Sequence, residues 1–244
     1  MKAQGNTVLV TGGGSGIGYA LARAFSQRGN QIIVCGRNRE KLSAVHRETP
    51  AIAVVPCDIS RDEDHRRLVA FVKKSYPDLN ILINNAGIQR NYSFTDGEDH
   101  SFFIDEELNV NFAAQVKLTD RFLPFLMQRP AAAIVNITSA LAVAPKQSAP
   151  VYCASKAAFH SFNKTLRWQL EGTSVKVFEI IPALVDTDMT KGRGRGKISP
   201  DALAAEALGG IESDQEEIRI GKTKILFALH RLLPSLAERV IRHG

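Results

Sequence analysis

A tyrosine and a lysine stand one helical turn apart in the segment SAPVYCASKAAF. They are Tyr152 and Lys156, and their neighbours are mostly small or apolar, which is unusual for a solvated helix face. A phenol has a pKa of about 10 and is a poor base at neutral pH. A lysine one turn away favours the phenolate, so we expect a lowered pKa and a tyrosine able to exchange a proton with a carbonyl/alcohol pair. The alternative is an ordinary i,i+4 surface pair.

A glycine-rich turn near the N-terminus has the composition of a phosphate-binding loop. TGGGSGIG follows the apolar run TVLVT, and Gly12, Gly16 and Gly18 open a helix expected over 17–28. Gly12 would allow the tight turn, Gly16 would let backbone approach a pyrophosphate, and Gly18 would let the helix pack on the strand. The free N–H groups of the helix would then face the phosphates.

The end of the second apolar run, QIIVCGRN, indicates which dinucleotide would bind. Gly36 and Arg37 stand where an NAD site usually carries a carboxylate for the ribose hydroxyls. Glycine leaves room for a 2′-phosphate and arginine can bind it, so we expect NADP(H) to be preferred over NAD(H). A solvated loop arginine is the alternative. Asp58 ends the third run, where it could bind the adenine amino group or simply form a turn.

Short apolar runs alternate with amphipathic segments along the whole chain. The expected strands are TVLVT, QIIVC, AIAVV, LNILIN, AAIVNIT, VKVFEII and EIRIG. The expected helices cover 17–28, 39–48, 62–76, 104–128 and 151–171. Continuously apolar strands are typical of parallel sheets covered on both faces. We therefore predict one α/β domain over 1–244, a Rossmann-like doubly wound three-layer fold with a seven-stranded parallel sheet flanked by helices.

Composition excludes several classes of function. The 244 residues are 44% hydrophobic with a net charge of +6, but no Lys/Arg block with interleaved aromatics indicates nucleic-acid binding. The basic balance also suits a phosphate-rich cofactor. Cys35, Cys57 and Cys153 form no CxxC, and the six histidines show no ligand spacing, so we expect neither a metal site nor a disulfide framework. No secretory leader or membrane-spanning run is recognisable, and we expect a cytoplasmic protein.

Taken together, these motifs resemble the short-chain dehydrogenase/reductase family over nearly the whole chain. TGxxxGxG is followed by NNAG and YxxxK, Ser139 lies thirteen positions before Tyr152, and Asn111 lies in LNVNFAAQ. Each residue alone has an ordinary structural alternative, but the ordered set is difficult to explain that way. Within the family, NNAGIQR, APVYCASKA and PALVDTDM are most similar to the oxidoreductases encoded beside D-alanyl-lipoteichoic acid genes.

The resemblance implies a role for each matching residue. Tyr152 is the implied general acid/base, Lys156 also binds the nicotinamide ribose, Ser139 holds the substrate oxygen, and Asn111 holds a water that links Lys156 to solvent. The implied cofactor contacts are Gly12, Ser15, Gly16, Ile17, Gly18, Arg37, Asn38, Asp58, Ile59, Asn85, Ala86, Gly87, Tyr152, Lys156, Pro182, Val185 and Thr187.

One position departs from the family pattern. Pro182 is followed by Ala183 where the family usually has glycine, and the methyl group would be strained only at a positive φ. The family places its substrate lid in the segment that follows, which we expect near 187–210. KGRGRGK within it either stays solvated or closes over an anionic substrate or the cofactor phosphates.

The sequence thus predicts an NADP(H)-dependent oxidoreductase acting on a small-molecule carbonyl/alcohol pair. A catalytically silent NADP-binding sensor or interaction protein is the alternative, and sugar, acyl and steroid substrates all stay open. By resemblance, the apolar faces of the two long helices predict a homodimer or homotetramer. The tail KILFALHRLLPSLAERVI should break at Pro234 and pack against a partner subunit or, alternatively, lie on a membrane surface.

Overall fold

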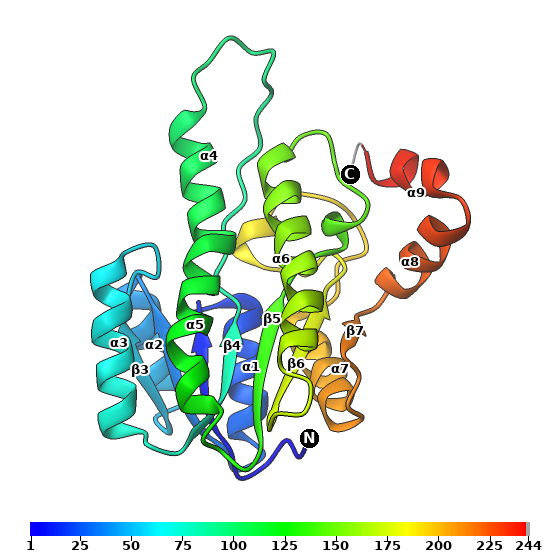
Figure 1. Cartoon of the computed structure of the whole chain (residues 1–244). Coiled ribbons are helices and arrows are strands. Elements are labelled where there is room, and N and C mark those ends of the chain that lie inside the picture. The colour runs from blue at the N-terminus through cyan, green and yellow to red at the C-terminus, as the bar shows by residue number, and fades with distance from the viewer. Residues whose placement is uncertain (243–244) are drawn as a thin grey trace.

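Seven parallel strands form one sheet in the order β3-β2-β1-β4-β5-β6-β7 (Figure 1). The structure is a computed structural model and describes residues 1–242; His243 and Gly244, which the predicted domain includes, lie outside the described residues. The strands are β1 (Thr7–Thr11), β2 (Gln31–Gly36), β3 (Ile52–Pro56), β4 (Leu79–Asn84), β5 (Ala132–Ile137), β6 (Val175–Ile181) and β7 (Glu217–Arg219). The predicted fold class is confirmed.

Helices cover both faces of this sheet. They are α1 (Gly16–Ser26), α2 (Arg39–Glu48), α3 (Asp62–Ser75), α4 (Ser101–Leu108), α5 (Ala114–Leu126), α6 (Pro150–Gln169), α7 (Pro200–Glu212), α8 (Thr223–Leu232) and α9 (Pro234–Ile241). In Figure 1, α3, α5 and α6 lie on the near face, and α1 and α7 lie behind the sheet. Successive strand residues therefore enter different cores. Val8 and Val10 pack with Phe25 of α1, and Leu9 packs with Phe122 of α5.

The helices depart from the sequence prediction near residue 109 and agree with it at Pro234. The helix expected over 104–128 is interrupted by a π-helical turn, Asn109–Ala113, between α4 and α5. The predicted break at Pro234 is confirmed, because α8 ends at Leu232 and Pro234 starts α9. Within the described part of the chain, no helix combines the length and apolar character needed to cross a membrane.

The second half of the expected lid is part of the core. Leu203 and Ala207 of α7 are buried with residues of α1. The lid proposal therefore concerns only residues 187–199, which include a short 3₁₀ turn at Asp188–Thr190 and the glycine-rich loop after it.

Candidate active site

The glycine turn connects β1 to α1 at the carboxyl edge of the sheet. Gly12 and Gly16 have φ angles of +65° and +56°, which only glycine adopts without strain. A Cβ at Gly18 would lie 2.4 Å from Asn85 Nδ2 and 2.5 Å from the Gly12 carbonyl oxygen. The turn at Gly12 and the close packing at Gly18 agree with the sequence prediction. Gly13 is equally constrained, since its Cβ would lie 2.5 Å from Val34 Cβ.

The NNAG segment after β4 holds this turn in place. Asn85 Nδ2 donates to the Thr11 carbonyl at 2.9 Å and to the Gly12 carbonyl at 3.2 Å. The backbone N–H groups of Asn85 and Ala86 donate to Thr11 Oγ1 at 3.0 and 3.1 Å. Asn85 therefore orders the backbone of the phosphate-binding turn through its side chain.

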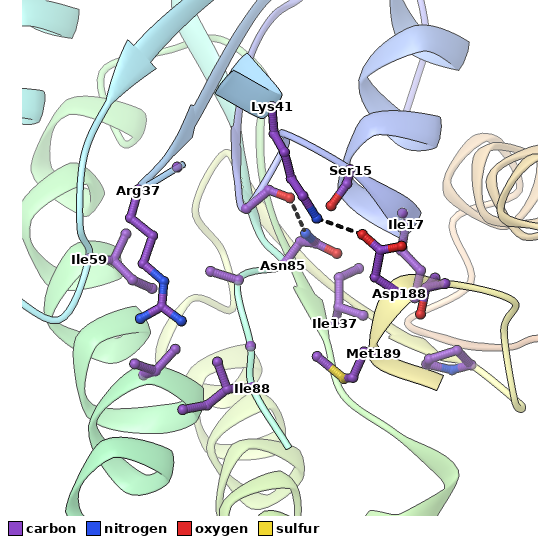
Figure 2. Close-up of a pocket in the computed structure, with 18 of the residues that line it drawn as sticks. Ser15, Ile17, Arg37, Lys41, Ile59, Asn85, Ile88, Ile137, Asp188 and Met189 are labelled. Carbon is purple, nitrogen blue, oxygen red and sulfur yellow. Dashed lines mark hydrogen bonds and ion pairs between the residues drawn. The ribbon is translucent and has the colours of Figure 1, made fainter. Parts of the chain in front are cut away.

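A cavity of about 360 Å³ opens beside the turn (Figure 2). It brings together most of the implied cofactor contacts, namely Gly12, Ser15, Gly16, Ile17, Arg37, Asp58, Ile59, Asn85, Ala86, Gly87, Tyr152, Lys156, Pro182 and Thr187. Sequence reasoning missed the lining residues Lys41, Ile88, Val110, Ile137, Thr138, Asp188 and Met189.

Three of the residues implied to contact the cofactor do not line this cavity. Gly18 packs under the turn. Asn38 caps α2 by accepting from the Lys41 backbone N–H at 2.9 Å. Val185 is buried, forms a bridge with Ile198 and lines a second cavity described below.

Two ion pairs flank the first cavity. The Arg37 guanidinium lies 3.5 Å from Glu106 Oε1 of α4, and Glu106 Oε2 accepts from Arg90 at 2.7 Å. On the opposite side, Lys41 Nζ of α2 donates to Asp188 Oδ2 at 2.6 Å (Figure 2). Arg37 thus reaches the cavity but already has a carboxylate partner.

Asp58 lies at the cavity edge after β3. Its Oδ1 accepts from the Ser60 backbone N–H at 3.0 Å and from the Ser60 hydroxyl at 2.7 Å. This local turn is the ordinary alternative that the sequence left open, and it coexists with a position facing the cavity.

Ser139, Tyr152 and Lys156 meet where β5 and the first turns of α6 come together. Each is less than a tenth exposed. Lys156 Nζ donates to the Ile137 carbonyl at 2.9 Å and lies 5.8 Å from the centroid of the Tyr152 ring. The predicted surface-pair alternative is wrong, because both side chains are buried.

Burial changes the expected protonation of this pair. Desolvation raises the pKa of Tyr152 to about 12, and the opposing hydrogen bond from Ser139 is smaller. Desolvation also lowers the pKa of Lys156 to about 8, against the charge of Glu179. In the protein without a bound nicotinamide, burial therefore acts against the expected lowering of the Tyr152 pKa.

Asn111 lies in the π-helical turn and is fully buried. Its Oδ1 accepts from the Ile88 N–H at 2.8 Å, and its Nδ2 donates to the Ile88 carbonyl at 2.9 Å and to Ser155 Oγ at 3.1 Å. Asn111 therefore fixes the strand-end segment after NNAG to the helix that carries Lys156.

A buried acid that the sequence did not single out lies behind Lys156. Glu179 of β6 accepts from Thr138 Oγ1 at 2.6 Å and pairs with His160 Nδ1 at 2.8 Å. Glu217 lies beside this pair, and ligand atoms of His160, Glu179 and Glu217 all lie within 4.8 Å of one another. Arg219 is already paired with Glu217 at 2.7 Å, so these carboxylates have cationic side chains as partners.

A second cavity of about 380 Å³ meets the first. The residues that line both are Ile17, Tyr152, Pro182, Thr187 and Met189. Ala183 lies in its wall, and Asp214 is the only non-glycine residue of the described chain with positive φ, so the Ala183 methyl group brings no backbone strain. Tyr152 therefore lies at the junction of the two cavities.

Fold and site together define an oxidoreductase of the Rossmann-like type. The family model described as short chain dehydrogenase matches residues 6–197. The chain is 42% identical over 224 residues to DltE, an uncharacterized oxidoreductase of Bacillus subtilis, with 89% of each chain covered. It is 31% identical to an uncharacterized oxidoreductase of Staphylococcus aureus, covering 82% of this chain and 88% of that one.

Solved structures of the same fold also belong to short-chain dehydrogenases. A short chain dehydrogenase from Burkholderia cenocepacia in complex with NADP has a TM-score of 0.88 at 26% identity, with both chains covered completely. One from Sphingobium yanoikuyae in complex with NADPH has a TM-score of 0.81 at 26% identity, covering 95% of this chain and 94% of that one. The chain belongs to the short-chain dehydrogenase family, and its predicted similarity to the oxidoreductases of the D-alanyl-lipoteichoic acid loci is confirmed by DltE.

Proposed function

We propose that the protein is an NADP(H)-dependent oxidoreductase that interconverts a carbonyl and an alcohol, with Tyr152 as the general acid/base. The observation that carries the proposal is the position of Tyr152 at the junction of the two cavities, hydrogen-bonded to Ser139 and beside Lys156. When bound, the cofactor supplies or accepts the hydride.

The first cavity fits a dinucleotide. Its turn presents the N-terminus of α1, an arrangement suited to phosphate, and Gly12, Gly16 and Thr187 line that part. Arg37, with no carboxylate at the end of β2, supports NADP(H) over NAD(H). Similar solved structures hold NADP or NADPH in two cases and NAD or NADH in two others, so the proposed preference rests on Arg37.

The chain's own residues suit proton transfer. A raised pKa keeps Tyr152 protonated near neutrality, as a donor to a carbonyl oxygen must be. Ser139 can position that oxygen, and a protonated Lys156 favours the phenolate left behind. Residues 187–199 line both cavities in part, and we propose that they act as the substrate lid.

Tyr152→Phe tests this role, because it removes the hydroxyl and keeps the ring. Turnover of NADPH with a panel of aldehydes and ketones should fall by about 10²–10⁴-fold, while NADPH affinity stays near that of the unchanged protein. Tyr76→Phe, at the end of α3 and far from both cavities, is the matched control. Wild-type turnover in Tyr152→Phe would refute the assignment, and NADPH binding without turnover of any carbonyl by the unchanged protein would favour the sensor.

We further propose that the protein assembles as a homodimer or homotetramer. Large apolar side chains are exposed on α6 and on the two C-terminal helices, including Trp168 (66% exposed), Leu232 (77%) and Val240 (62%). Figure 1 shows α8 and α9 standing to one side of the sheet, away from α4 and α5. Light scattering of the purified protein should give a mass of two or four chains.

A further inference from the structure

All the charged residues that line the second cavity are basic. Its lining includes Lys146, Arg193, Arg195 and Lys222, and no aspartate or glutamate of the described chain lines it. Much of the rest of the wall is apolar, with Leu141, Leu184, Val185, Met189, Leu226 and Ile241. A ligand that satisfies this wall combines an apolar body with negative charge.

The first residue of α8 provides a hydroxyl without a partner. Thr223 lines the cavity and is 1% exposed, and its Oγ1 has no hydrogen-bond partner. A buried hydroxyl is normally paired, so an unpaired one beside a cavity indicates a ligand atom. Thr223 starts a ten-residue helix, and the positive end of its dipole favours an anion there.

The glycine-rich loop adds two cations to the cavity wall, Arg193 and Arg195. Arg193 lines the cavity, and its Nη1 is buried without a partner. The loop lies close to the cavity wall: a Cβ at Gly194 would be 2.3 Å from Leu184 Cδ2, and one at Gly196 would be 3.2 Å from Lys222 Nζ.

The other two loop cations, Lys191 and Lys197, do not line the cavity. Lys197 Nζ is held by Asp186 at 3.2 Å and by the Thr190 carbonyl at 2.7 Å. Lys191 is exposed and does not line the cavity. The cations of the loop therefore have different environments. Lys197 stabilises the loop itself, Lys191 is solvated, and Arg193 and Arg195 line the cavity.

We propose that an anionic group of the substrate binds at the start of α8, between Thr223 Oγ1, Lys222 and Arg193, while the reacting carbonyl lies at Tyr152 and Ser139. The carbonyl end rests on the proposed function, and the anion end does not. The substrate class is then an apolar carbonyl compound that carries a carboxylate or phosphate away from the reacting carbon.

Binding without reaction tests the anion end alone. Octanoate, octyl phosphate and neutral octanamide are titrated calorimetrically into the protein saturated with NADP⁺. The anions should bind at least about tenfold more tightly than the amide, as expected for charge-assisted hydrogen bonds in a partly desolvated site. Thr223→Val and Arg193→Gln should each reduce anion affinity by about tenfold and leave octanamide unchanged, whereas Lys191→Gln should change neither.

Turnover separates the two proposals. We expect 8-oxooctanoate to have a lower KM than its methyl ester, with the difference lost in Thr223→Val and Arg193→Gln. Equal affinity for octanoate and octanamide, or an unchanged difference in both variants, overturns the anion site even if both aldehydes are reduced. Tight anion binding that depends on Thr223 and Arg193, without reduction of either aldehyde, supports the anion site and contradicts the proposed reaction.

Discussion

Replacing Arg37 by alanine tests cofactor choice, because this side chain reaches the first cavity but is paired with Glu106. A charge-assisted hydrogen bond to a 2′-phosphate contributes about 1.5–3 kcal/mol. Arg37 is more than half exposed and must give up its 3.5 Å pair with Glu106, a type of contact that contributes about 0–1 kcal/mol. The net loss in NADPH binding should be about 1–2 kcal/mol, or about 5- to 30-fold in Kd.

The assay is the ratio of the Kd values for NADH and NADPH, measured by fluorescence titration. Arg37→Ala should lower this ratio by weakening NADPH alone, and Arg39→Ala, an exposed cation outside the cavity, should leave it unchanged. Glu106→Gln should shift the ratio the other way, because it frees Arg37 and removes a negative charge near the phosphate. An unchanged ratio in Arg37→Ala would show that no 2′-phosphate contacts Arg37.

Two further outcomes are expected. Gly209→Ala should raise the free energy of unfolding by about 0.5–1 kcal/mol, because a Cβ at Gly209 meets nothing within 4 Å. Gly210→Ala should lower it by about 1–3 kcal/mol, because a Cβ at Gly210 would lie 2.7 Å from Ile218 Cγ1. Thermal melts that shift both variants in the same direction would contradict this. The pKa of Lys156 is lowered from 10.5 to about 8 in the folded protein, so between about pH 8 and 10.5 the unfolded chain binds more protons than the folded one. The free energy of unfolding should therefore rise with pH across this window, by up to about 3 kcal/mol. Urea denaturation should show this rise in the unchanged protein relative to Lys156→Met.

Local patterns were sufficient to predict the sheet and the glycine turn. The strands other than the short β7 come from largely apolar runs whose alternate residues enter two cores, so the runs themselves indicate a sheet covered on both faces. The positive φ of Gly12 and the packing of Gly18 on the Gly12 carbonyl lie within one strand–turn–helix unit, whereas Asn85 and Ala86, which also crowd the turn, follow β4.

The features that sequence reasoning missed arise between segments far apart in the chain. Lys41 meets Asp188 across 147 positions, and no spacing rule relates them. The raised pKa of Tyr152 depends on how completely the fold buries it, which a lysine one turn away does not reveal. Thr223 belongs to no sequence motif, and only the fold shows that it lines a cavity together with Lys222 and Arg193.

The π-helical turn makes the length of the segment between α4 and α5 important, although the segment is helical throughout. Removing one residue from Asn109–Ala113 could restore a regular α-helix, but it would rotate α4 by about 100° relative to α5. Glu106 would then leave Arg37, and Glu107 would leave its buried bond from the Arg90 N–H. A single-residue deletion here should therefore break the contacts at Arg37 and Arg90, even though almost any helix-forming sequence would preserve the local secondary structure.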